Sequence, residues 1–310
     1  MSSFPRRRYH AGSPALFLGL LLCAVALHGQ ELAPGAYAAA PVGVNVIVLA
    51  NTLQGGDLTF DPSAPIEDGK ATINASSLGF ARTLDVAGRS AQIAIGLPYV
   101  LGNVEGIYIG EFTKVHRSGI GDPRLRFGIN LYGAPAMNLK EFAGHRQRTS
   151  IGASLNVVIP AGQYDPAKLI NIGSNRWSFK PEIGVTHRFG KWTVEYFGGA
   201  WMFTDNDNFF GGRLRKQDPI GSTQFHFTRT FRPRLWVAFN ANFYFGGRTT
   251  VDDTKNLDLQ TNSRVGVTLA VPVARRQSIK IAFSRGAYTS IGADFNAIGI
   301  SYQYLWGAGL

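Results

Sequence analysis

The sequence predicts an all-β protein: an antiparallel outer-membrane β-barrel of about twelve transmembrane strands. Apolar residues alternate with small or polar residues along most of the 310-residue chain, as in strands whose two faces meet different surroundings. Most of these segments are about 8–12 residues long, the length that a tilted strand needs to cross a bilayer. The links between them are alternately long and short, which is typical of outer-membrane barrels. The expected strands cover residues 42–48, 76–84, 91–99, 124–131, 151–159, 177–185, 192–203, 222–229, 235–245, 264–271, 278–285 and 296–306.

The composition agrees with this fold class. Glycine accounts for 37 residues and aromatic residues for 12%, whereas charged residues make up only 16%. An apolar content of 45% excludes a disordered chain. Beyond the N-terminus no apolar run reaches about 18 residues, so a bundle of transmembrane helices is excluded.

The first 29 residues predict a signal peptide. Three arginines, Arg6 to Arg8, precede an apolar run over residues 15–27 and the small residues Ala24 to Ala26. This order of basic, apolar and small residues is that of a cleaved export signal. We expect cleavage between Ala26 and Gln30, so that residues 1–29 are the signal peptide and residues 30–310 form the barrel domain.

The only cysteine is Cys23, which lies inside the predicted signal peptide. The mature chain would therefore contain no cysteine. This excludes disulfide scaffolds, thiol catalysis and cysteine-type zinc sites.

The links predict which rim of the barrel faces which compartment. An even number of strands places both termini on the rim with the short links, and in an outer membrane this rim is periplasmic. One link on that rim, over residues 133–148, is unexpectedly long. The long links cover residues 54–73, 100–122, 160–175, 204–220 and 246–261, and the short ones cover 189–191, 230–233 and 272–277.

The last strand carries a predicted assembly signal. An amphipathic final strand that ends in aromatic residues is similar to the signal read by the barrel-assembly machinery, which we therefore expect as a partner. The residues of this signal are Gly299, Tyr302, Tyr304 and Trp306.

The net charge of +11 does not predict a nucleic-acid surface. Three of the charges belong to the signal peptide, and many others lie on the short links, for example Arg188, Lys191, Arg232 and Arg275. A nucleic-acid site would need one basic stripe with motif support, so no nucleic acid is expected as a partner.

Charged strand residues fall on the polar face, which must line the lumen because charges facing lipid cost about 2–4 kcal/mol each at mid-bilayer. Their cationic excess favours a passage for anionic or phenolic solutes. An internal salt-bridge network that fills the barrel explains them equally well, and twelve strands leave the choice between an open and a closed lumen undecided. The expected lumen residues are Arg124, Arg126, Lys180, Glu182, Glu195, Trp201, His226, Asn240, Asn242, Arg264 and Lys280.

The sequence predicts neither an enzyme nor a cofactor or metal site. His226 is the only histidine at the centre of an expected strand, and no serine-hydrolase motif accompanies it. The six histidines show no metal-ligand spacing. The run from Asp205 to Asp207 begins like a calcium loop, but no glutamate closes it.

The whole mature chain resembles the outer-membrane transporter family named for the meta-pathway of phenol degradation. The resemblance implies an outer-membrane barrel associated with uptake of aromatic or other apolar compounds, and it implies no catalytic residues. The matching stretches are Pro34-Gly35-Ala36-Tyr37, Pro41-Val42-Gly43-Val44-Asn45, Gly121-Asp122-Pro123-Arg124, residues 160–166, residues 172–177, Phe179-Lys180-Pro181-Glu182 and Gln217-Asp218-Pro219-Ile220.

We therefore expect an outer-membrane transporter or channel for small molecules that are aromatic or otherwise apolar, or anionic. Its partners would be outer-membrane lipid and a small-molecule solute, with loop aromatic residues such as Tyr164, Trp177, Phe209 and Phe210 along the passage. The alternatives are a structural or adhesive barrel with a closed lumen, and a barrel-wall hydrolase that would need a serine within hydrogen-bond distance of His226. The sequence does not predict the oligomeric state, the identity of the solute, or whether it leaves along the axis or through the wall.

Overall fold

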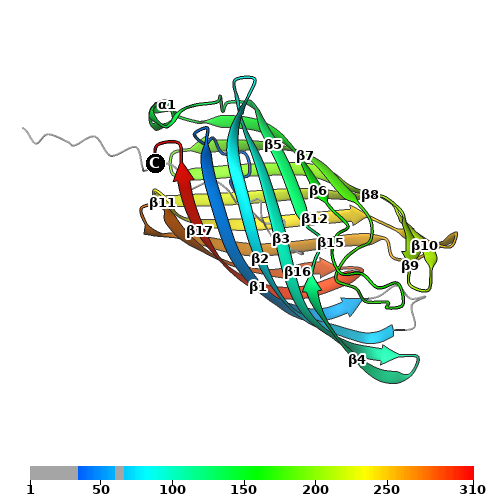
Figure 1. Cartoon of the computed structure of the whole chain (residues 1–310). Coiled ribbons are helices and arrows are strands. Elements are labelled where there is room, and N and C mark those ends of the chain that lie inside the picture. The colour runs from blue at the N-terminus through cyan, green and yellow to red at the C-terminus, as the bar shows by residue number, and fades with distance from the viewer. Residues whose placement is uncertain (1–33, 60–65) are drawn as a thin grey trace, which may run out of the picture.

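A computed structural model describes residues 34–59 and 66–310. Within them, twelve antiparallel strands form a closed barrel because β17 pairs with β1 (Figure 1). The predicted fold class is confirmed; the predicted signal peptide, residues 1–29, lies outside the described residues. The barrel strands in spatial order are β1 (Val44–Thr59), β2 (Ile66–Val86), β3 (Arg89–Tyr108), β5 (Arg124–Tyr132), β6 (Thr149–Val158), β7 (Ser178–Phe189), β8 (Trp192–Phe203), β11 (Ile220–Arg232), β12 (Leu235–Gly246), β15 (Gln260–Ala274), β16 (Gln277–Thr289) and β17 (Gly292–Gly307).

The remaining elements lie at the two ends of the barrel. Helix α1 (Leu139–Gly144) and the C-terminus lie at one end, which we call the turn end, and β4 (Glu111–Ile120) reaches the opposite loop end (Figure 1). No helix of the described residues is long and apolar enough to cross a membrane. The loop end also carries a four-stranded sheet of β9 (Asn206–Phe209), β10 (Arg213–Gln217), β13 (Thr249–Val251) and β14 (Thr254–Lys255).

The alternation along the strands separates an apolar outer face from a small or polar inner face. On β3, the outward Ile93, Ile95 and Leu97 are exposed, whereas the inward Ala94 and Gly96 are buried. An outer surface of large apolar side chains suits lipid contact. The inner face leaves room for the polar residues described below.

Strand β1 reverses this arrangement. Its valines, Val44, Val46 and Val48, were expected on the apolar outer face with the other alternating residues, but they are buried inside the barrel. There they form an apolar cluster with Met137 and Phe142, which the link before β6 supplies. The expectation was wrong because the sequence pattern of β1 does not show that this link folds back under the barrel.

Two of the expected long links are largely strand. Pairing of β1 with β2 continues to Leu58 and Gly69, and β3 and β4 pair up to Tyr108 and Glu111. Beyond the apolar band both faces of a hairpin meet water, so the alternation fades although the backbone hydrogen bonds continue. The short links are confirmed as two-residue turns, as between β7 and β8 at residues 190–191.

The long link at the turn end contains α1, a helix that was not predicted from the sequence. Asn138 accepts a hydrogen bond from the Glu141 backbone N–H, and the Glu141 carboxylate accepts one from the Asn138 backbone N–H. This reciprocal capping stabilises the start of a helix. The asparagine and glutamate spaced by three residues were the missed sequence signal.

The barrel wall is irregular between β3 and β5. Strand β3 pairs with β5 only from Ala91 to Gly96, and nearer the loop end it pairs with β4 instead. The second edge of β4 has no strand partner among the described residues. It meets the loop after β6, where the Gln163 N–H donates to the carbonyl of Ile120 at 2.9 Å. We call this junction between β4 and the loop the wall seam.

Candidate functional site: a filled lumen and a pocket at the loop end

The middle of the lumen is filled by a polar network. Lys180 Nζ lies 2.7 Å from Glu182 Oε2, and both side chains are buried. Gln224 Nε2 donates to the same carboxylate oxygen at 2.9 Å. Buried charges of this kind are stable only when they are paired and hydrogen-bonded, so these side chains form one connected network on the inner wall.

A second part of the network surrounds His226. Its Nδ1 lies 2.8 Å from Asn240 Oδ1, and Asn240 Nδ2 donates to Thr268 Oγ1 at 3.1 Å. His226 Nε2 has no hydrogen-bond partner among the described residues. No serine therefore lies within hydrogen-bond distance of His226 there, and the hydrolase alternative is contradicted.

The segment before β1 also enters the lumen. We call residues 34–43 the N-terminal plug. Tyr37 is 1% exposed, its hydroxyl lies 2.9 Å from Ser154 Oγ, and it donates to Glu182 Oε1 at 3.2 Å. The Gly35 N–H donates to Glu195 Oε2 at 2.8 Å. These residues belong to a stretch that carries the family resemblance, but no place in the barrel was predicted for them.

All the expected lumen residues lie on inner-face positions of the barrel. Lys180 approaches the ring of Trp201 and Lys280 that of Trp236, while Arg264 donates to the carbonyl of Phe295 at 2.8 Å. Their role as a solute path stays a prediction. Those that are buried are Arg126, Lys180, Glu182, Glu195, His226, Asn240, Asn242, Arg264 and Lys280.

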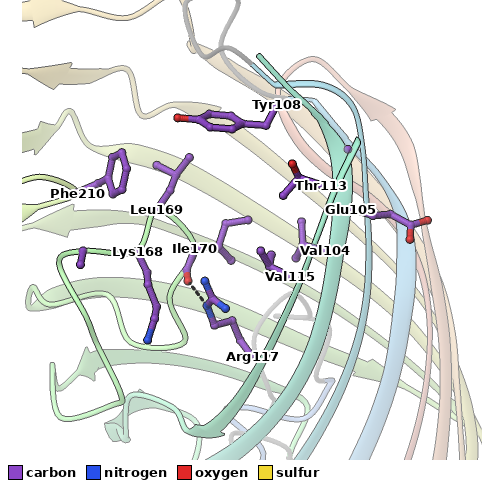
Figure 2. Close-up of a pocket in the computed structure, with 12 residues that line it drawn as sticks. Val104, Glu105, Tyr108, Thr113, Val115, Arg117, Lys168, Leu169, Ile170 and Phe210 are labelled. Carbon is purple, nitrogen blue, oxygen red and sulfur yellow. Dashed lines mark hydrogen bonds between the residues drawn. The ribbon is translucent and has the colours of Figure 1, made fainter. Parts of the chain in front are cut away.

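A pocket of about 240 Å³ lies at the loop end, between the β3–β4 hairpin and the loop after β6. Val104 and Val115 line it from the hairpin, and Leu169 and Ile170 face them from the loop (Figure 2). Phe210 lies on the far side, whereas Glu105 points away from the pocket (Figure 2). The lining is mostly apolar, as in sites that bind small apolar molecules.

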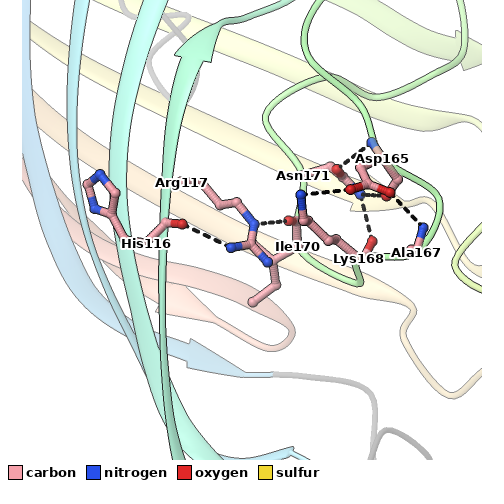
Figure 3. A network of polar contacts seen from close by, with 7 residues as sticks. All are labelled: His116, Arg117, Asp165, Ala167, Lys168, Ile170 and Asn171. Carbon is pink, nitrogen blue, oxygen red and sulfur yellow. Dashed lines mark hydrogen bonds and ion pairs between the residues drawn. The ribbon is translucent and has the colours of Figure 1, made fainter.

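The loop that closes this pocket is held by polar contacts. Arg117 of β4 donates through Nε to the carbonyl of Ile170 at 2.9 Å (Figure 3). Asn171 bonds to the backbone of Asp165 in both directions. The Lys168 ammonium donates to the Asp165 carboxylate at 2.7 Å and thereby holds the pKa of Asp165 below its usual value. The pocket wall is therefore ordered before any solute arrives.

Asp122 joins three parts of the chain at the wall seam. Its Oδ1 accepts from the Gly162 N–H at 2.9 Å, and its Oδ2 accepts from the backbone N–H and the hydroxyl of Ser174 at 2.8 and 2.6 Å. A Cβ on Gly162 would lie 2.7 Å from the Asp122 backbone nitrogen, so only glycine fits there. Three of the stretches that carried the family resemblance thus meet at one buried carboxylate, which the sequence analysis did not single out as a site.

The other aromatic residues expected along the passage lie at the loop end. Tyr164 donates to the carbonyl of Asn208 at 3.0 Å. Arg176, beside Trp177, lies over the ring of Phe203 at 4.3 Å, and burial lowers the pKa of its guanidinium to about 9. These residues fasten the loops to one another.

The predicted assembly signal lies on β17. Gly299 pairs with Thr52, and Tyr302, Tyr304 and Trp306 continue along the same edge against β1. The strand therefore closes the barrel, and its recognition by assembly machinery stays a prediction. The described residues contain no cluster of three or more side chains that could hold a metal ion.

Comparison with solved structures places the fold among outer-membrane barrels. The chain is similar to the COG4313 outer membrane channel from Pseudomonas putida F1, at 21% identity and a TM-score of 0.75 over 89% of this chain and 100% of that one. It is more distantly similar to the transport unit of the autotransporter AIDA-I from Escherichia coli, at 10% identity and a TM-score of 0.48 over 93% of this chain and 95% of that one. Comparison with curated proteins gave no significant match.

Neither the family match nor the solved structure with a similar fold points to an enzyme, in agreement with the sequence prediction. The family resemblance noted in the sequence is confirmed. A family profile matches residues 50–298, most of the chain. The chain therefore belongs to the family described as "Putative MetA-pathway of phenol degradation".

Proposed function

We propose that the protein is an outer-membrane channel for small apolar molecules, aromatic compounds among them. The pocket at the loop end carries this proposal, because its apolar walls, formed by Val104, Val115, Leu169 and Ile170, suit an aromatic ring better than an ion. Anionic solutes have less support, since Lys180 already has Glu182 as its ion partner.

The orientation follows from the expected export route. We propose that residues 1–29 are removed on export, that barrel-assembly machinery reads β17, and that the turn end with both termini faces the periplasm. The pocket would then face the cell exterior. A solute from outside reaches it before the filled part of the lumen.

The route beyond the pocket follows from the two irregular parts of the barrel. The Lys180–Glu182 pair and Tyr37 occupy the inside of the barrel and narrow the route along its axis. At the wall seam, the loop replaces a strand partner for β4. We propose that an apolar solute leaves the pocket at this seam, where loop contacts open more readily than a continuous strand ladder.

Uptake into liposomes tests this function. Proteoliposomes would be exposed to phenol, benzoate and an uncharged sugar, and solute entry would be followed over time. We expect phenol to enter faster than in protein-free liposomes and the sugar to enter at the background rate. The Leu169→Asp variant should lose most of the phenol uptake because it places a charge in the apolar pocket.

A matched control is Leu257→Asp, which changes an exposed leucine of another loop at the same end. It should leave uptake unchanged. Equal uptake by the Leu169→Asp variant and the wild-type protein would contradict entry through the pocket. No phenol uptake by the wild-type protein would favour the alternative of a structural or adhesive barrel with a closed lumen.

A further inference from the structure

The geometry around Tyr37 points to a phenol-binding site inside the lumen, occupied by the chain's own phenol side chain. We propose that a small free phenol competes with Tyr37 for this site and displaces the N-terminal plug. The inference rests on the proposed function in one respect, namely that the phenol is a solute of the same channel.

The barrel wall is shaped to receive an aromatic ring at this point. Gly152 of β6 and Gly184 of β7 are paired neighbours on the inner face. A Cβ on Gly152 would lie 2.2 Å from the Tyr37 ring, and one on Gly184 would lie 2.4 Å from it. Because real side chains do not approach so closely, the ring fits only where both wall residues lack a side chain.

The surroundings of the ring match the chemistry of a phenol. Phe197 lies edge-on at 5.1 Å between ring centroids and at 88°, a favourable arrangement for two aromatic rings. The Arg126 guanidinium lies 5.3 Å from the centroid of the Tyr37 ring, within the range of cation–π attraction. At the hydroxyl end, Ser154 and Glu182 supply hydrogen-bond partners. Each of these contacts engages the phenol group itself.

Arg126 adds a second indication of a ligand site. It is 6% exposed, and its Nη1 and Nη2 have no hydrogen-bond partner in the described part of the chain. Buried guanidinium nitrogens are normally bonded. A free phenol is not tied to a backbone and can place its oxygen where Arg126 donates to it.

A phenol and Tyr37 cannot occupy the site together. The cavity beside Arg126 and Tyr37 measures only about 20 Å³, the space of a single water molecule. A ring therefore enters only when Tyr37 leaves. The end of the plug nearest β1 is anchored by hydrogen bonds from the Val42 N–H to the Met137 carbonyl and from the Gly43 N–H to the Thr83 carbonyl. Residues 34–40 would swing out by breaking their own hydrogen bonds to the wall, which run from Gly35 to Glu195 and from Ser150 and Gln147 to the Tyr37 carbonyl. The plug would stay attached to the wall at residues 42 and 43.

The first test is phenol binding to a Tyr37→Ala variant, by titration calorimetry in detergent. Loss of a buried ring leaves a cavity on the order of 150 Å³, a size that binds benzene in a protein interior. We expect the variant to bind phenol at least about tenfold more tightly than the wild-type protein, because no side chain competes. Phenol should also bind more tightly than benzene, which lacks the hydroxyl.

Matched glycine variants locate the binding. In the Tyr37→Ala background, Gly152→Ala points a methyl group into the site and should weaken phenol binding at least about tenfold. Gly198→Ala in the same background should have no effect, since no atom lies within 4 Å of its added Cβ. Absence of phenol binding by Tyr37→Ala, or equal effects of the two glycine variants, would overturn the proposed site.

The second test keeps Tyr37 and measures plug release directly. A mature Ala39→Cys protein would be labelled with a maleimide, since Ala39 is 4% exposed while the plug is in place. Phenol should raise the labelling rate severalfold and leave a Leu257→Cys control unchanged. An unchanged rate for Ala39→Cys at phenol concentrations that saturate Tyr37→Ala would overturn the competition.

These outcomes are distinguishable from failure of the proposed function. Both measurements use detergent-solubilised protein and require no transport. Phenol binding without liposome uptake would refute the channel function alone. Uptake that is lost in Leu169→Asp, with no phenol binding by Tyr37→Ala, would refute the lumen site alone.

Discussion

Replacing Asp122 with alanine should release the loop that forms one wall of the pocket. The Asp122 carboxylate is 2% exposed and accepts three hydrogen bonds, one from Gly162 and two from Ser174. In the variant, these three donors lose their acceptor. The contacts join the start of β5 to both halves of the loop, so their loss acts on the loop and not on the barrel ladder.

The magnitude follows from the number of donors. A buried donor without an acceptor costs about 1–3 kcal/mol. Because water reaches some of these groups, the loss of the acceptor for all three donors should lower the local stability of the loop by about 3–5 kcal/mol. Since about 1.4 kcal/mol corresponds to tenfold in an equilibrium constant, the open form of the loop should become roughly 100-fold or more populated.

Amide hydrogen exchange measures this opening. Peptides that cover residues 160–175 should exchange roughly 100-fold faster in Asp122→Ala, while peptides from β11 and β12 should keep their rates. In Asp122→Asn, the loop should exchange at a rate between those of the wild-type protein and Asp122→Ala, since the asparagine amide keeps one oxygen acceptor. Unchanged exchange of the loop in Asp122→Ala would refute the role assigned to the carboxylate.

Three further results are expected. Lys180→Met should lower the free energy of unfolding by about 3–5 kcal/mol because it leaves Glu182 buried without its ion partner, and adding Glu182→Leu should restore most of the loss in the same denaturation assay. Asn138→Ala should cost about 1 kcal/mol by removing the cap of α1, visible as faster exchange around Phe142. Phenol binding at the loop-end pocket should stay constant between about pH 5 and 8 and weaken only in stronger acid, measured by titration across pH. The lowered pKa of Asp165 sets the pH at which this weakening begins. The contact between the Asp165 carboxylate and Lys168 is fully present above the usual carboxyl pKa, and it is lost as the pH falls through the lowered pKa of Asp165.

The sequence by itself determined the barrel and its two faces. Alternation places the side chains of Ile93 and Ile95 on one face and Ala94 on the other through the geometry of an extended chain, with no tertiary information. The short links were also predicted from the sequence, although the turns, as between β7 and β8 at residues 190–191, are shorter than the predicted links. The family resemblance also depended on sequence alone, since short stretches such as Gly121-Asp122-Pro123-Arg124 carry it.

Strand lengths were less predictable. The β3–β4 hairpin extends beyond the apolar band, where backbone hydrogen bonds hold it and alternation no longer marks it. Likewise, β10 pairs with β13 across two separate loops. Pairing between distant loops leaves no local pattern in either of them.

Only the tertiary structure decided how the lumen is filled and which residues line the pocket that we propose as a solute site. Tyr37 precedes the first strand, yet it contacts residues more than a hundred positions away, such as Ser154 and Glu182. Asp122 likewise meets Gly162 and Ser174, which lie 40 and 52 positions further along the chain. Periodicity reports which face a residue takes, because that is fixed by its nearest neighbours along the chain. It does not report which side chains meet across a closed barrel, because that depends on the strand register and on the path of the loops.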